Sequence, residues 1–259
     1  MKNLNNFLAG IIFVFSLVVY ILTMAPTTSF WDCGEFIATS VIMGVPHPPG
    51  TPFYLLLGNF FSQIPIFDDL GARVNLISHI FSAFAVMFLY IIIVKLIEAW
   101  RGETKTWPDF LITYGSALIG AFTFAFTDSH WFNAVEAEVY SISTFFTSIV
   151  VWLILKWSTN SGHAGNVRYI LIIAYMFGLA IGIHLLNLLA LPFIALIVYF
   201  NKYEFKVNTF LATIGITLAT FMIIYLGIIK GIPNLANSYG LNIPIIIVLL
   251  IFAATAYAI

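Results

Sequence analysis

The sequence predicts an all-α, polytopic transmembrane helical bundle, and three observations support this fold class. Of the 259 residues, 61% are hydrophobic and only 8% are charged, whereas roughly a quarter of the residues in a soluble domain are charged. The mean hydropathy is +1.03. The apolar runs are as long as a transmembrane helix requires and lack the alternation of barrel strands. A net charge of -1 gives no reason to expect a nucleic-acid partner.

Polar clusters divide the chain into eight predicted spans. They cover residues 7–24, 71–95, 110–127, 139–156, 168–184, 186–200, 208–229 and 244–259. The last run ends on an apolar residue without a flanking charge or aromatic belt. We therefore expect a single transmembrane domain over residues 1–259 that forms the N-terminal part of a longer protein.

Two apolar runs need a separate justification. The first, from Phe7 to Met24, has 18 residues, which is longer than the ~7 to 15 of a signal peptide, and Pro26 follows it. We expect a retained first helix. The run at 53–64 has 12 residues, fewer than the ~17 needed to cross a membrane. It is predicted to be an interfacial helix that leads the first outer loop back to the membrane.

The distribution of basic residues predicts the orientation of the spans. With a cytoplasmic N-terminus, the inner side holds Lys2, Lys95, Arg101, Lys105, Lys156, Arg168, Lys202 and Lys206, and the outer side holds Arg73 and Lys230. This bias follows the positive-inside rule. Basic residues at both ends of 168–202 predict two short spans that turn near His184 and Asn187. Both side chains would need polar partners in the bundle, and a packing role is as consistent with the sequence as a substrate role.

The stretch from Pro26 to Pro52 is the candidate active site of this chain. Asp32 and Glu35 are three residues apart and would share one face of a helical turn beside Trp31, at the boundary between water and lipid. Two carboxylates so close together raise one pKa, which suits a general base or a pair of metal ligands. The alternative is a solvated acidic turn that follows a helix.

Two further residues near this stretch could contact an anion. Prolines on both sides of His47 fix its backbone, and a rigidly held imidazole suits phosphate or hydroxyl recognition. His47 could equally be incidental to a proline-rich corner. Arg73 could pair with Asp68 and Asp69, or its guanidinium could hold a lipid phosphate.

The second predicted outer loop, residues 128–138, adds further polar groups. It contains His130, Glu136 and Glu138. Together with the two acids and the histidine of the first loop, these groups could form an oxygen-rich divalent site. No two of them have a recognised ligand spacing, so neither a metal nor another cofactor is expected. The single cysteine, Cys33, excludes an internal disulfide and a multi-cysteine metal site.

Several catalytic patterns are missing from the sequence. It contains no G-x-S-x-G, H-E-x-x-H, G-x-x-x-x-G-K-[ST] or G-x-G-x-x-G. A nucleotide-driven pump, a zinc metalloprotease and a soluble-nucleotide enzyme therefore have no support.

Five motifs together resemble one family of membrane enzymes. They are WDCGEF at 31–36, VPHPPGTPFYLLLGNFF at 45–61, GARVNLISHIFSAF at 71–84, EAEVYS at 136–141 and GLAIGIHLLNLLALP at 178–192. The chain resembles the GT-C superfamily of membrane glycosyltransferases, in particular the bacterial relatives of the plexin-type protein O-mannosyltransferases. The resemblance covers essentially the whole chain, and its most specific parts are WD-x-x-E and HPPG.

The resemblance implies a reaction and a set of roles. A mannose-like sugar would pass, with inversion, from a polyprenyl-phosphate donor to a hydroxyl acceptor, a protein Ser or Thr, on the outer side of a bacterial inner membrane. Asp32 would be the catalytic base, assisted by Glu35. The implied substrate-binding residues are Trp31, His47, Arg73, Glu136, Glu138 and His184.

Two other functions remain consistent with the sequence. A transporter or lipid-handling protein could use the outer acids to bind a cation or a cationic substrate, although neither inverted repeats nor broken midplane helices are visible. A non-catalytic subunit could dock partners through the same outer loops.

Overall fold

The computed structural model describes residues 2–48, 50–160 and 166–258, and these residues form helices and no strands. The first unit contains α1 (Lys2–Leu22), α2 (Cys33–Ile42), α3 (Pro52–Ser62), α4 (Leu70–Arg101), α5 (Trp107–Phe110), the π-helix η1 (Leu111–Gly115), α6 (Ser116–Ala125), α7 (Asp128–Ala134), α8 (Val139–Thr159), α9 (Val167–Ile181) and the 3-10 helix η2 (Leu185–Leu189). The second unit contains α10 (Ala190–Lys202), α11 (Val207–Met222), the π-helix η3 (Ile223–Gly231), α12 (Ile232–Tyr239) and α13 (Asn242–Ala258). The predicted all-α class is confirmed.

All eight predicted apolar runs form helices, and glycines fix two of the boundaries that the prediction placed too early. The run predicted at 71–95 extends to Arg101 and ends at Gly102, whose φ is 91°. The run predicted at 208–229 continues to Tyr239 and ends at Gly240, whose φ is 80°. Glycine occupies this left-handed region without steric cost, so the helix stops there.

The number of membrane crossings is not fixed by the helices alone. Among the described residues, five helices are long and apolar enough to cross: Asn3–Leu22, Leu70–Arg101, Val139–Thr159, Leu185–Lys202 and Val207–Tyr239. A sixth would combine Trp107–Ala125 with Asp128–Ala134 across a 66° bend. The helices at 167–181 and 242–254 are apolar but shorter. The chain therefore has the helices of an integral membrane protein, and the count of eight spans stays a prediction.

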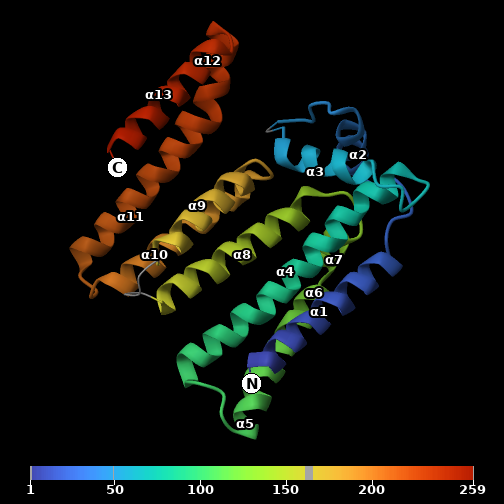
Figure 1. The fold of residues 1–259 in the computed structure, drawn as a ribbon, viewed down its shortest axis with the longest axis vertical. Coiled ribbons are helices and arrows are strands. Elements are labelled where there is room, and N and C mark those ends of the chain that lie inside the picture. The colour runs from blue at the N-terminus through green and yellow to red at the C-terminus, as the bar shows by residue number, and fades with distance from the viewer. Residues whose placement is uncertain (1, 49, 161–165, 259) are drawn as a thin grey trace. The chain divides into compact units, whose positions relative to one another are not determined.

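The first unit is organised around α4, the long helix in its centre (Figure 1). One buried cluster joins α4 to α1 and α6, and a second joins it to α2, α3, α8 and α9. Figure 1 shows α2 and α3 at the end of α4 where α8 begins. The first and second predicted outer loops therefore meet at the same end of this unit.

Two predictions concern the connections near this end of the unit, namely a helix at 53–64 and a turn near His184. The run predicted at 53–64 is α3, and its first turn contacts the end of α9 because the backbone N–H of Phe53 donates to the carbonyl of Gly182 over 3.1 Å. The predicted break near His184 is confirmed, since α9 ends at Ile181 and η2 follows. Residues 161–165, which lie between the spans predicted at 139–156 and 168–184, and Pro49 are outside the described residues.

Candidate active site

The two acids of the first loop lie at the start of α2. Asp32 is its N-cap residue, and its carboxylate is exposed and makes no capping hydrogen bond. Glu35 lies in the first turn. Trp31, with φ of 59° and 85% of its surface exposed, precedes them. A left-handed backbone is uncommon for a bulky residue. The predicted proximity of the two acids is confirmed.

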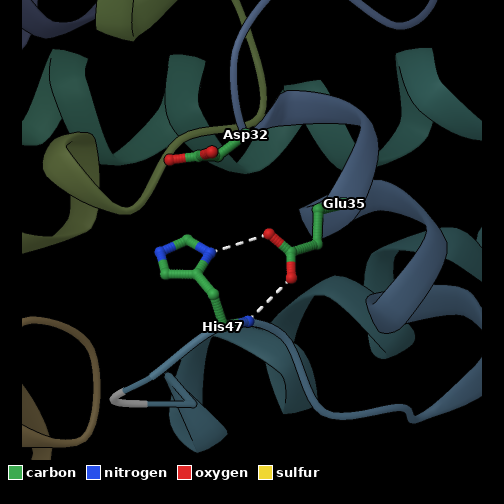
Figure 2. Close-up of side chains that lie close together, drawn as sticks. All are labelled: Asp32, Glu35 and His47. Atoms are coloured by element: carbon green, nitrogen blue, oxygen red, sulfur yellow. Dashed lines mark hydrogen bonds and ion pairs between the residues drawn. The ribbon is translucent and has the colours of Figure 1, made fainter.

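Glu35 is bound by His47, which the sequence analysis treated as a separate candidate. The backbone N–H of His47 donates to Oε1 of Glu35, and Nδ1 of His47 lies against Oε2, each over 2.7 Å (Figure 2). The hydrogen bond from the imidazole lowers the pKa of Glu35, and the same bond raises the pKa of His47. The like-charge effect predicted from the neighbouring acid is therefore not what shifts the pKa of Glu35. Its main partner is an imidazole.

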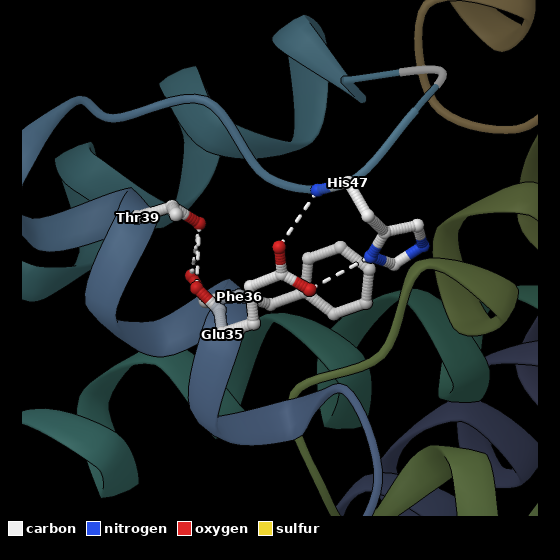
Figure 3. Close-up of polar contacts among 4 residues, drawn as sticks. All are labelled: Glu35, Phe36, Thr39 and His47. Carbon is white, nitrogen blue, oxygen red and sulfur yellow. Dashed lines mark hydrogen bonds and ion pairs between the residues drawn. The ribbon is translucent and has the colours of Figure 1, made fainter.

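The backbone around this pair is fixed by local contacts. The hydroxyl of Thr39 donates to the carbonyl of Glu35 over 2.6 Å, and the imidazole lies 5.8 Å from the ring of Phe36 (Figure 3). Phe36 in turn packs 5.3 Å from the buried ring of Tyr54 on α3. His47 is thus held from one side by a carboxylate and from the other by aromatic packing.

Two asparagines that the sequence analysis did not single out anchor this loop. The amide of Asn75, within α4, donates to the carbonyls of Ala25 and Thr27 over 2.8 and 3.1 Å. The amide of Asn59, on α3, donates to the last carbonyls of α2, including that of Ser40 over 3.0 Å. A buried amide inside an apolar span needs such partners, and Asn75 carried this signal in the sequence.

The acids of the second loop are buried beside the first loop. Glu136 is 1% exposed and Glu138 is 5% exposed. Burial raises the pKa of Glu136, with a hydrogen bond from Ser29 opposing the shift. Burial also raises the pKa of Glu138 to about 7, reinforced by the charges of Glu136 and Asp32 and opposed by His47. The fold therefore brings the predicted acids of both loops into one electrostatic neighbourhood.

Arg73 does not pair with the acids that the sequence offered as its partners. Its Nε donates to the carbonyl of Phe67 over 2.5 Å, and its Nη1 donates to the carbonyl of Ser62 over 3.0 Å. Asp69 instead caps α4 by accepting from the backbone N–H of Ala72 over 3.0 Å. The arginine holds the segment between α3 and α4.

The remaining polar candidates make contacts elsewhere. The ring of His130 is buried and lies 4.2 Å from Phe124. The ring of His184 lies 5.0 Å from that of Tyr140, at the start of α8. Asn187 is buried, and its amide nitrogen donates to the carbonyls of Ala180 and His184. Its amide oxygen accepts from the hydroxyls of Ser143 and Thr147. The predicted need of Asn187 for partners inside the bundle is confirmed.

One group of side chains in the described part of the chain has the spacing of metal ligands. Asp32, Glu35 and His47 each offer a ligand atom, and these atoms all lie within 4.8 Å of one another. The expectation of a metal-free site was based on the absence of such spacing in the sequence. The fold supplies the proximity that the linear order did not show.

Comparisons with known proteins agree with the motifs. The family described as the protein O-mannosyl-transferase TMEM260 N-terminal domain matches residues 32–207, a range that begins at Asp32. The protein O-mannosyl-transferase tmem260 of Dictyostelium discoideum is 28% identical over 197 residues, which are 71% of this chain and 22% of that relative. The protein O-mannosyl-transferase TMEM260 of Mus musculus is 26% identical over 176 residues, 67% of this chain and 23% of the relative. The chain thus spans less than a quarter of the length of these curated relatives. No solved structure matches.

Proposed function

Since this chain belongs to the protein O-mannosyl-transferase TMEM260 N-terminal domain family, we propose that it carries the catalytic loop of a membrane glycosyltransferase. The enzyme would move a mannose-like sugar from a polyprenyl-phosphate donor to a Ser or Thr hydroxyl of a protein, on the extracytoplasmic face of a bacterial inner membrane. The names of the relatives support transfer to protein. The donor, the side of the membrane and the GT-C fold are part of the proposal.

The observation that carries this proposal is the state of Asp32. Its carboxylate is exposed and makes no capping hydrogen bond, and the hydrogen-bonded pair of Glu35 and His47 lies beside it. An acid with a structural role would be bonded or buried. A free carboxylate next to a rigid loop is what a general base requires, because it must reach the acceptor proton.

The chemical step follows from these positions. Asp32 takes the proton of the acceptor hydroxyl while that oxygen attacks the anomeric carbon of the sugar. The bond between this carbon and the phosphate oxygen breaks, and the phosphate leaves with the electron pair. A single displacement inverts the anomeric carbon. Glu35 acts as a positioning residue, because its two contacts orient His47 toward the phosphate end of the donor.

The surroundings of the loop suit an amphipathic donor. Leu56 and Phe60, one helical turn apart on α3, are 55% and 62% exposed, so this helix presents an apolar face. The prenyl tail would lie along that face while the sugar lies over the polar loop beside Trp31. We further propose that Glu136, Glu138 and His184 border the sugar and that Arg73 supports the loop without touching phosphate.

The test is a transfer assay in membranes that contain the purified full chain. Labelled polyprenyl-phosphate mannose and a Ser/Thr-rich peptide are supplied on the outer side, and label on the peptide is measured. We expect transfer that depends on Asp32. Transfer of label to lipid alone, or none from any lipid-linked sugar, would contradict the proposed reaction.

A further inference from the structure

The ligand atoms of Asp32, Glu35 and His47 have the mutual distances of groups around a single ion. They all lie within 4.8 Å of one another, and Figure 2 shows the three side chains converging on one space. Oxygen and nitrogen ligands bind divalent cations at roughly 2.0 to 2.5 Å, so atoms around one cation lie roughly 3 to 5 Å apart. The observed spacing fits one cation once Glu35 and His47 exchange the hydrogen bond between their side chains for bonds to the ion.

The backbone positions that carry the three groups are fixed before an ion arrives. Asp32 and Glu35 occupy the N-cap and the first turn of α2. His47 follows a buried proline, and its backbone N–H is bonded to Glu35 over 2.7 Å. A site whose ligands are ordered in advance loses less conformational entropy on binding. The side chains of His47 and Glu35 are 46% and 38% exposed, so coordination positions remain open toward a substrate.

The charge around this space is negative, although the site is proposed to receive a phosphate. Asp32 and Glu35 line this space, and Glu138 is close enough for the charge of Asp32 to raise its pKa. The carboxylate of Glu138 is 5% exposed, and its Oε2 has no hydrogen-bond partner among the described residues. One imidazole does not balance these groups. The phosphate of the donor would approach like charges.

The cation that the sequence offered for this phosphate is used elsewhere. Two donors of Arg73 are bonded to the carbonyls of Phe67 and Ser62. A bound metal ion would reverse the local charge, because such an ion is often the largest local charge in its site. Manganese and magnesium ions commonly bind one or two carboxylates and complete their coordination with substrate phosphate oxygens.

We propose that Asp32, Glu35 and His47 bind one divalent cation of the Mn²⁺ or Mg²⁺ class, and that this cation holds the phosphate of the donor. Two carboxylates and one imidazole suit such ions, whereas a softer thiolate site is excluded because Cys33 is buried against Asn75. One oxygen of Asp32 would bind the ion while the other faces the acceptor hydroxyl. This inference is based on the proposed function and names the ion that its substrate requires.

The experiment measures binding of Mn²⁺ to the purified full chain in detergent after removal of metals with EDTA. Free Mn²⁺ is followed by electron paramagnetic resonance, which needs neither donor nor transfer. We expect one saturable site, and Asp32→Asn, Glu35→Gln and His47→Gln should each weaken its affinity at least about tenfold. Asp128→Asn is the matched control, because it removes another exposed acid, at the start of α7, and should leave the affinity unchanged.

Each outcome decides between the cation and the proposed function. Absence of a saturable site, or equal affinity in Asp32→Asn and the parent, would overturn the cation site, and the metal-free mechanism expected from the sequence would stand. The same holds if Asp128→Asn weakens binding as much as the others. Mn²⁺ binding without sugar transfer would support the cation and contradict the proposed function. Transfer that persists in excess EDTA, without a Mn²⁺ site, would support the proposed function and contradict the cation site. Melting curves of each variant show that a loss of binding is not a loss of folding.

Discussion

Replacing Asp32 by asparagine tests the catalytic assignment most directly. The substitution keeps the size of the side chain and removes its charge and its basicity. The carboxylate is exposed and makes no capping hydrogen bond, so the fold does not depend on it. Substitutions at exposed positions without such contacts usually change the free energy of unfolding by less than about 0.5 kcal/mol. The melting temperature should therefore stay near that of the parent protein.

The expected effect on turnover is large by comparison. A positioned general base contributes roughly 10²- to 10⁴-fold, which corresponds to about 3 to 5 kcal/mol of activation free energy. The rate of peptide mannosylation in membranes should fall by that factor at saturating donor. Glu35→Gln should be milder, because the amide oxygen of glutamine can still accept the backbone N–H of His47. Asp128→Asn serves as the control and should transfer at the parent rate.

Two results would refute the assignment of Asp32. One is full transfer activity in Asp32→Asn. The other is an activity loss that accompanies a drop in melting temperature, since the residue would then act through the fold. In either case the base would have to be sought elsewhere, and the binding functions that the sequence left open would gain support.

Three further predictions concern packing, pH and topology. A Cβ atom at Gly58 would lie 2.1 Å from Oγ of Ser40, so Gly58→Ala should lower the free energy of unfolding by roughly 1 to 3 kcal/mol, and adding Ser40→Gly should restore the melting temperature. No recovery in the double variant would contradict this contact. The pKa of Glu138 is raised from 4.5 to about 7, so its contribution to stability is complete below about pH 4.5 and is lost as the pH rises to 7. The loss amounts to about 3 kcal/mol. Thermal unfolding of Glu138→Gln, measured in excess EDTA, should therefore depend less on pH than that of the parent protein. Equal pH profiles would refute the burial of its charge. Accessibility tags should report cytoplasm at 101–108 and the outer side at 128–138, and the reverse at either loop would overturn the orientation.

Local patterns were enough to predict where helices form. Apolar runs became helices because a backbone in an apolar environment must satisfy its own hydrogen bonds, and the turn near His184 followed from basic residues on both sides. Short helices such as α2 and α7 were not predicted as elements. Each has at most ten residues, and its stability depends on tertiary packing more than on its own sequence.

The sequence by itself determined the all-α membrane class and the candidate loop with its two acids. These follow from composition and from residues within a few positions of one another. Only the tertiary structure decided the partners: His47 meets Glu35 across 12 residues, Glu138 becomes a buried neighbour of Asp32, and Arg73 is bonded to backbone carbonyls. No local pattern encodes these contacts, because they depend on how α2, α3 and α8 pack around α4. Burial and distance set the charge of an acid, and both are properties of the folded chain.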